Sequence, residues 1–142
     1  MDYCFYCADD EKRKSLMIEI IKLDFSTIYL NKDQSHLGRV VVKYNDHKTE
    51  YFQLTEEERN GFFKELAIAS QAIYNLYKPN KLNYATFGDL VPHIHVHLVP
   101  KYKDKLNWGS AFDDSLEKQF LLEADYNKMI AEIKDEIEKL TK

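Results

Sequence analysis

The stretch from His93 to Pro100 constrains this chain most, because three of the five histidines alternate there with aliphatic residues, His-Ile-His-Val-His-Leu-Val-Pro. Successive side chains of a β-strand point to opposite faces of the sheet. The pattern therefore predicts a strand over 93–99, with His93, His95 and His97 on one face and apolar residues on the other. The apolar row can pack on a core. The imidazole row makes a poor core, since each ring carries a polar nitrogen that needs a partner. The histidine row is therefore a candidate functional site.

Length and composition narrow the class of protein. The chain has 142 residues, 44% of them apolar and 31% charged, which predicts one soluble globular domain over 1–142. Its net charge of −4 and the absence of a basic block argue against binding a nucleic-acid polymer. No apolar run approaches about 18 residues and no leader is visible, so we expect no membrane span and a cytoplasmic location. Four scattered glycines exclude a glycine-rich phosphate loop.

The remaining pattern predicts both strands and helices. A capping box begins at Thr55 and opens a long amphipathic helix that ends before Pro79. A second amphipathic helix is expected over about 125–140, with Asp125 as its cap. Residues 9–14 read as a solvated turn, and 88–92 as the five-residue loop of a hairpin. The other expected strands are 16–23, 25–30, 39–43 and 82–87.

The spacing of residues along a strand suggests that the three histidines have different roles and do not all bind one metal ion. Alternate residues lie about 6.6 Å apart, which separates His93 and His97 by roughly 13 Å along a regular strand. All three can share one metal only if the strand bends sharply. One neutral imidazole can instead act as a nucleophile, while its neighbour binds or protonates an oxyanion. This division suits phosphoryl or nucleotidyl transfer. A zinc hydrolase with two triad histidines as ligands is the alternative.

The two cysteines form a second candidate site. Cys4 and Cys7 have the spacing of a zinc-ligand pair, and histidines must supply the other two ligands, for which His47 and His93 are the candidates. The result would be a structural Zn²⁺ site of the Cys2His2 type. A redox motif usually follows a strand, whereas only three residues precede Cys4, so that alternative is weaker. Two unpaired buried cysteines are the remaining possibility.

The triad resembles the His-φ-His-φ-His-φ-φ pattern (φ apolar) of the HIT, or histidine triad, superfamily. The resemblance runs from Cys4 to about Gly109, and residues 93–108 are most similar to the branch of diadenosine tetraphosphate hydrolases. It implies an α+β fold, with about five antiparallel strands, one long central helix and a C-terminal helix, and a homodimer. It also implies that His95 attacks the α-phosphate of a nucleotide and that His97 contacts the phosphate oxygens. The zinc ligands of relatives match Cys4, Cys7, His47 and His93.

Three departures from the family pattern bear on the substrate. Arg39 stands where other branches have a histidine, with His36 three residues earlier. Asp89 occupies a loop where many relatives carry an amide, and Lys101 replaces an arginine, which loses the bidentate fork. The residues that the resemblance implies for substrate binding are Arg39, Asn83, Asp89, His97, Lys101 and Trp108.

The function that these observations favour is a nucleotide hydrolase or transferase. It would cleave a dinucleoside polyphosphate at the α-phosphate through a nucleotidyl-histidine on His95. The alternatives are a nucleotide-binding regulatory protein with little turnover and a nucleoside phosphoramidase, although the Gly/Ser-rich loop of the phosphoramidase branch is absent.

Overall fold

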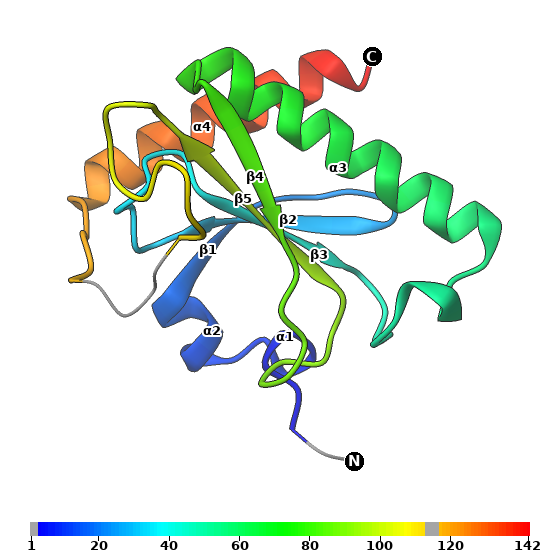
Figure 1. Cartoon of the computed structure of the whole chain (residues 1–142). Coiled ribbons are helices and arrows are strands. Elements are labelled where there is room, and N and C mark those ends of the chain that lie inside the picture. Colours follow the sequence, from blue (N-terminus) through cyan, green and yellow to red (C-terminus); the bar gives the residue numbers. More distant parts are fainter. Residues whose placement is uncertain (1–2, 113–116) are drawn as a thin grey trace.

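The computed structural model describes residues 3–112 and 117–142, which are built around a five-stranded antiparallel sheet (Figure 1). The strand order is β1-β2-β3-β5-β4, so β1 and β4 form the edges. The strands are β1 (Met17–Lys22), β2 (Ser26–Asn31), β3 (Val40–Tyr44), β4 (Lys81–Ala85) and β5 (His95–Lys101). The helices are α1 (Phe5–Ala8), α2 (Glu11–Leu16), α3 (Glu56–Tyr77) and α4 (Glu123–Leu140), with a 3-10 turn at Tyr51–Gln53. The expected α+β architecture is confirmed.

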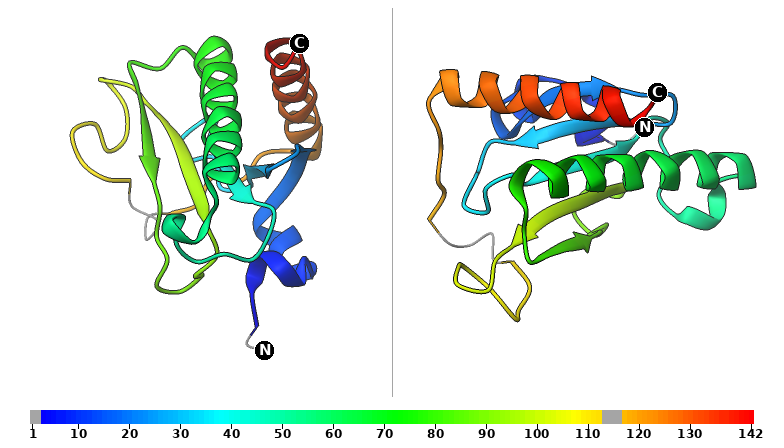
Figure 2. Two further views of the ribbon diagram at one scale, coloured as in Figure 1. Left: turned by 90° about the vertical axis from the view of Figure 1, so that its right-hand side faces the viewer. Right: turned by 90° about the horizontal axis from the view of Figure 1, so that it is seen from above.

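Helices α3 and α4 lie side by side against one face of the sheet (Figure 2). Alternate residues of the central strands, including Val42, Val96 and Leu98, are buried between the sheet and these helices. The helices contribute Phe62, Ala69, Ala72 and Ile73 from α3, and Tyr126, Met129, Ile133 and Ile137 from α4. The apolar row of the triad segment therefore packs on the main core, as its alternation predicts.

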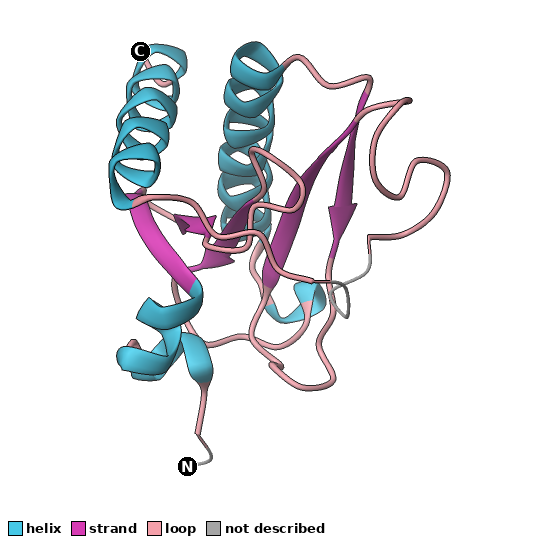
Figure 3. Cartoon of the chain, turned by 90° about the vertical axis from the view of Figure 1, so that its left-hand side faces the viewer, coloured by secondary structure: helices cyan, strands magenta, loops and turns pink. Residues whose placement is uncertain are grey.

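The opposite face of the sheet carries His95 and His97 of the triad. Helices α1 and α2 lie near the start of β1, away from α3 and α4 (Figure 3). Tyr6 of α1 packs in a small second core with Tyr29 and Val41, whose side chains alternate with those of the main core. Val41 is the strand partner of His97. His97 and His95 therefore belong to the sheet face that α1 only partly covers.

Helix α3 has the boundaries that the sequence predicts. The hydroxyl of Thr55 accepts a hydrogen bond from the amide of Glu58, and the Glu58 carboxylate accepts one from the amide of Thr55. This capping box pairs two amides that would otherwise lack partners within the helix. The helix ends at Lys78, which adopts a left-handed conformation directly before Pro79.

The triad strand begins two residues later than predicted. His93 precedes β5, because the amide of His93 bonds the oxygen of Val91 in a turn and the amide of Ile94 bonds the oxygen of Lys48. The loop between β4 and β5 is therefore longer than the expected five residues. At its other end β5 continues through Pro100 to Lys101. β3 pairs with β5 only as far as Leu98. Pro100 has no N–H to donate, but it lies beyond this paired stretch, so no hydrogen bond between β3 and β5 is lost there.

Other boundaries differ in smaller ways. Residues 11–14, expected in a turn, belong to α2, where the Asp10 carboxylate accepts a hydrogen bond from the amide of Lys12. Helix α4 begins at Glu123, so Asp125 lies within its first turn and is not the cap. The strands other than β5 match the expected ranges to within two residues. No helix in the described ranges is long and apolar enough to cross a membrane.

Candidate functional site

Four potential metal ligands from distant parts of the chain meet beside α1. Cys4 caps α1 and Cys7 lies within it, while His47 follows β3 and His93 precedes β5. Their ligand atoms all lie within 4.8 Å of one another. The Nδ1 atoms of His47 and His93 are 3.3 Å apart, and Cys7 Sγ is 3.3 Å from the Nδ1 of His47. The Nδ1 of His93 is 3.4 Å from the Sγ of Cys4 and 3.6 Å from that of Cys7.

These separations fit a tetrahedral zinc site. Zn–N bonds of about 2.05 Å and Zn–S bonds of about 2.3 Å at tetrahedral angles place two nitrogens about 3.3 Å apart, and a nitrogen and a sulfur about 3.6 Å apart. The measured distances lie close to these values. Two thiols and two imidazoles are also a donor set that zinc prefers over harder cations. The cluster of Cys4, Cys7, His47 and His93 therefore fits Zn²⁺ in both chemistry and spacing.

The ring of His93 is oriented for ligation. Its Nε2 lies 2.7 Å from the backbone oxygen of Tyr44, which can only accept, so Nε2 carries the proton and Nδ1 faces the cluster. Burial lowers the pKa of His93 to about 4; neighbouring His47 adds to the shift, and the bond to Tyr44 opposes it. Burial raises the pKa of the Cys7 thiol, as does the neighbouring Cys4. A bound cation would counter that rise and stabilise the thiolate.

His95 is held in the opposite tautomer. Its Nδ1 lies 2.6 Å from the backbone oxygen of His93, so Nδ1 donates and Nε2 keeps its lone pair. The side chain is buried. Burial lowers the pKa of His95, partly offset by this hydrogen bond, and so favours the neutral ring. The Nε2 atom of His95 therefore has the protonation state of a nucleophile at neutral pH.

His97 lies beside His95 and bonds to Arg39. The two imidazole centroids are 5.2 Å apart. The Nη2 of Arg39 is 3.1 Å from the Nδ1 of His97, and a guanidinium only donates, so this Nδ1 accepts. The proton of a neutral His97 is then on Nε2. The neighbouring histidines thus differ in tautomer, with a lone pair on Nε2 of His95 and a donor on Nε2 of His97.

His95, His97 and Arg39 line one cavity of about 570 Å³. Its other walls come from α1 and α2, from the β2–β3 turn, from the loop before β5 and from the segment before α4. They include Tyr6, Asn31, Lys12, Lys32, Lys118 and Phe120. Three lysines and an arginine line the cavity beside one carboxylate, that of Asp33, so its lining is cationic in a chain of net charge −4. The cavity therefore favours an anionic ligand.

Other residues implied for substrate binding lie apart from these histidines. Asn83, Lys101 and Trp108 line a separate cavity at the far end of β4 and β5. The ammonium of Lys101 donates to the backbone oxygens of Asn107 and Ser110, 2.5 and 2.7 Å away. Asp89 is exposed and is not among the described residues that line the histidine cavity. The structure thus brings Arg39 and His97 to the cavity that His95 lines, and it does not bring Asn83, Lys101, Trp108 or Asp89 there.

No pattern in the sequence points directly to two aromatic residues at this site. The ring of Tyr6 lies 5.1 Å from that of His95 and 5.5 Å from that of His93. Tyr6 lies between Cys4 and Cys7 in the sequence. A metal cluster that joins these two cysteines to His93 must bring the residues between them close to the triad, and this is the sequence signal that could have indicated Tyr6. Phe112 stacks on Arg39 and lies 5.9 Å from His97, and no local pattern indicates this contact.

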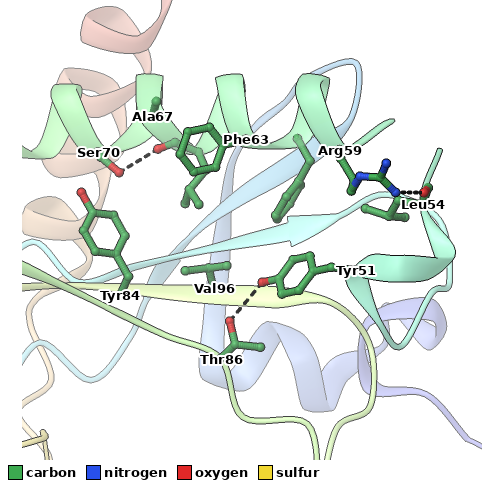
Figure 4. Close-up of a pocket in the computed structure, with 11 residues that line it drawn as sticks. Tyr51, Leu54, Arg59, Phe63, Ala67, Ser70, Tyr84, Thr86 and Val96 are labelled. Carbon is green, nitrogen blue, oxygen red and sulfur yellow. Dashed lines mark hydrogen bonds between the residues drawn. The ribbon is translucent and has the colours of Figure 1, made fainter. Parts of the chain in front are cut away.

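A larger cavity of about 700 Å³ lies on the helix side of the sheet (Figure 4). It is lined mainly by apolar side chains, among them Phe63 of α3, Tyr84 of β4 and Val96 of β5. Val96 points away from the histidine face. This cavity is therefore separate from the candidate catalytic site, and the chemistry described above does not involve it.

Comparisons with known proteins agree with this geometry. The HIT domain family model matches residues 15–104, more than half of the chain. Curated relatives from several Saccharomyces cerevisiae strains, named bis(5'-adenosyl)-triphosphatase, are 35% identical over 69 residues. That match covers 45% of this chain and 33% of those proteins, so the chain spans about a third of their length.

Solved structures share the fold. A histidine triad protein from Bradyrhizobium japonicum superposes with a TM-score of 0.82 at 22% identity, covering 90% of this chain and 96% of that one. One from Marinobacter aquaeolei gives 0.83 at 18% identity, covering 93% and 96%. A zinc-bound histidine triad family protein from Mycobacterium smegmatis gives 0.66 at 17% identity, covering 97% and 95%. On the family-model match and the triad itself, this chain belongs to the HIT domain family.

Proposed function

We propose that the protein is a nucleotidyl hydrolase that cleaves dinucleoside polyphosphates at the α-phosphate, with His95 as nucleophile. The observation that carries the proposal is the 2.6 Å contact between His95 Nδ1 and the oxygen of His93, which leaves Nε2 unprotonated in a cationic cavity. The S. cerevisiae relatives, named bis(5'-adenosyl)-triphosphatase, support the substrate class.

The chemistry follows from the two tautomers. The Nε2 lone pair of His95 attacks the α-phosphorus, an N–P bond forms, and the P–O bond to the leaving phosphate breaks with its electron pair. The ring of His95 then carries positive charge, which the Nδ1–H bond to the carbonyl of His93 stabilises. The Nε2–H of His97 donates to a phosphate oxygen. Water next attacks the phosphorus, releases the nucleoside monophosphate and restores His95.

The test is capture of the covalent intermediate. The protein is mixed with diadenosine triphosphate or tetraphosphate, quenched in base and analysed by mass spectrometry for an acid-labile adenylyl group on His95. We expect the adduct in the wild-type protein and none in His95→Ala. The control variant His36→Gln also loses a buried histidine and should still form it. Wild-type turnover by His95→Ala would contradict the proposal.

The competing function is nucleotide binding with little turnover. The engagement of Lys101 by the backbone of residues 107 and 110 favours it, because this cation is held away from the histidine cavity. A pure binder would bind adenosine nucleotides and form no adduct. The third candidate function is that of a nucleoside phosphoramidase. It is tested by offering a nucleoside phosphoramidate beside the dinucleoside polyphosphates, since a phosphoramidase would turn over the phosphoramidate faster.

We also propose that the cluster of Cys4, Cys7, His47 and His93 holds a structural Zn²⁺. Zinc would fasten α1 to the two segments that flank β3 and β5, and it would perform no chemistry on the substrate. Ligation requires reduced thiols, which are kept in the cytoplasm, so we propose that location. Zinc analysis of the purified protein tests this site. Full occupancy in a Cys4→Ser/Cys7→Ser double variant would argue against it.

The apolar cavity beside α3 supports a homodimer, which we propose as the assembly. β4 is an edge strand, and the neighbouring side chains of Phe63 and Tyr84 are 70% and 52% exposed (Figure 4). An exposed edge and aromatic groups beside it suit a self-complementary two-fold contact. Sedimentation should give a dimer for the wild-type protein and a monomer for Phe63→Glu. Tyr74→Glu, also on α3 but outside the cavity lining, is the control and should remain dimeric.

A further inference from the structure

A stretch of chain outside the family-model match forms part of the wall of the histidine cavity. The match ends at residue 104, whereas Lys118 and Phe120 lie in the stretch 117–122 that leads into α4. Both side chains line this cavity together with His95. The part of the chain that matches the family therefore assigns no role to either residue.

Hydrogen bonds hold this stretch against the β2–β3 turn. The oxygen of Gln119 accepts from the amide of Gln34 at 2.8 Å, and the amide of Gln119 donates to the Asp33 carboxylate at 3.0 Å. The same carboxylate oxygen accepts from the amide and the hydroxyl of Ser35. This carboxylate of the cavity wall therefore serves to fix the backbone on one side of Phe120.

Tyr126 of α4 anchors the backbone on the other side of Phe120. Its buried hydroxyl accepts from the amide of Leu121 at 3.0 Å and donates to the oxygen of Lys32 at 2.7 Å. The chain is thus fixed both before and after Phe120. A side chain that is carried on a fixed backbone loses less conformational entropy when a ligand orders it.

The ring of Phe120 is open to the solvent of the cavity. Its side chain is 63% exposed. Other aromatic residues of the cavity wall are engaged, because Tyr3 lies under the ammonium of Lys12, and Phe5 and Tyr6 pack edge to face. Phe120 makes no ring or cation contact with the described residues, 3–112 and 117–142. The ring is therefore both fixed through its backbone and available to a ligand.

We propose that Phe120 is the surface on which a nucleobase of the substrate stacks. This inference rests on the proposed function and deepens it. The cavity of about 570 Å³ presents lysines and the imidazole of His95 to a phosphate, and the exposed ring of Phe120 to a base. A phenyl ring has no hydrogen-bonding atom, and every base has a π-face. Stacking on Phe120 therefore selects ligands that carry a base and does not distinguish adenine from guanine.

The experiment compares the binding of adenosine monophosphate with that of ribose 5-phosphate by calorimetry. Both ligands contain ribose and a phosphate, and only the first carries a base. The wild-type protein should prefer adenosine monophosphate. We expect Phe120→Ala to weaken its binding by about 5- to 150-fold, the usual effect of losing one stacked base. The affinity of this variant for ribose 5-phosphate should not change.

Leu122→Ala is the matched control. Leu122 is 75% exposed on the same stretch and is not among the described residues that line the histidine cavity, so this variant should bind both ligands as the wild type does. Phe120→Trp keeps an aromatic surface and should retain the preference for adenosine monophosphate. Phe120→Leu keeps an apolar side chain without the π-face and should lose most of that preference.

Ring-current shifts provide a second measurement. The adenine protons of bound adenosine monophosphate should move upfield with the wild type and with Phe120→Trp, and should not do so with Phe120→Leu. Equal wild-type affinity for the two ligands would overturn the inference. An unchanged affinity of Phe120→Ala for adenosine monophosphate, or an equal loss for both ligands, would overturn it as well. If the wild type forms no His95 adduct, the proposed function fails, and these binding measurements still decide the role of Phe120.

Discussion

The Nδ1 of His95 donates to the backbone oxygen of His93 across 2.6 Å, while the side chain of His93 belongs to the Cys4–Cys7–His47 cluster. One residue therefore joins the candidate metal site to the candidate nucleophile. Its ring is a candidate ligand, and its carbonyl sets the tautomer of His95. A metal that fixes the ring of His93 also fixes the position of that carbonyl.

Metal removal should therefore affect both stability and catalysis. A site with ligand at a hundredfold excess over Kd stabilises a fold by about 2.7 kcal/mol, and we expect chelation to lower Tm by about 5–10 °C. The adenylation rate of His95 should fall as well, because the carbonyl of His93 becomes less fixed. Calorimetry and adduct formation, with and without chelator, measure the two effects. Added zinc should restore both, and an unchanged Tm together with an unchanged rate would contradict the linkage.

The metal-free protein should lose stability as the pH falls from about 6.5 towards 4. In the unfolded chain His93 takes up a proton near its ordinary pKa of 6.5, whereas burial holds its folded-state pKa at about 4. The unfolded state therefore binds more protons in this window, and the free energy of unfolding decreases with falling pH. The lowered pKa of His95 acts in the same direction. Urea titrations across this range measure the slope.

The matched variant for that experiment is His93→Gln, also studied without metal. It removes the titrating ring and should show a shallower dependence on pH between 6.5 and 4. Equal slopes in the two proteins would mean that other groups carry the effect.

The elements that could be predicted from the sequence are those with local signals. The start of α3 was found because both halves of its capping box lie within four residues, Thr55 to Glu58. The four cluster residues were found because cysteine spacing is local and few histidines were available as partners. The start of β5 was missed because the turn at His93 depends on the bond between Ile94 and Lys48, 46 residues apart in sequence.

The surroundings of His95 and His97 needed the three-dimensional structure for the same reason. Arg39 was identified, yet its bond to His97 and its stacking on Phe112 connect segments 58 and 73 residues away. The resemblance implies Lys101 for substrate binding, and the structure shows its ammonium donating to two carbonyl groups of the turn after β5. Sequence spacing indicates which residue types are present, but it does not show which partner satisfies each of them.

Glycine is required at position 38, directly before Arg39. Gly38 has φ +92°, and a Cβ there would lie 2.8 Å from the Cδ2 of Tyr77. Gly38→Ala should destabilise the protein by about 1–3 kcal/mol, since both the backbone conformation and the contact are unfavourable. Gly88→Ala is the matched control, because a Cβ at Gly88 meets nothing within 4 Å. Denaturant unfolding of both variants measures the difference, and equal midpoints would refute the expectation.

Tyr6 should couple α1 to both sites. Its buried ring packs on His93 and His95 and on Tyr29 beneath them. Tyr6→Ala opens a cavity at this contact, and we expect a loss of about 3 kcal/mol in stability. Because the ring supports both the candidate ligand His93 and the proposed nucleophile His95, zinc affinity and the adenylation rate should fall together. Isotherms for zinc and rapid-quench measurements of the adduct report the two quantities.

Tyr6→Phe separates packing from the hydroxyl group. It keeps the ring against His95, so its stability, zinc affinity and adenylation rate should stay close to those of the wild type. If Tyr6→Phe is as impaired as Tyr6→Ala, the hydroxyl group and not the ring carries the effect. If Tyr6→Ala loses stability but keeps both zinc affinity and rate, α1 supports the fold without positioning the histidines. The joint loss is expected because the aromatic ring is the one side chain of α1 that touches both His93 and His95 among the described ring contacts.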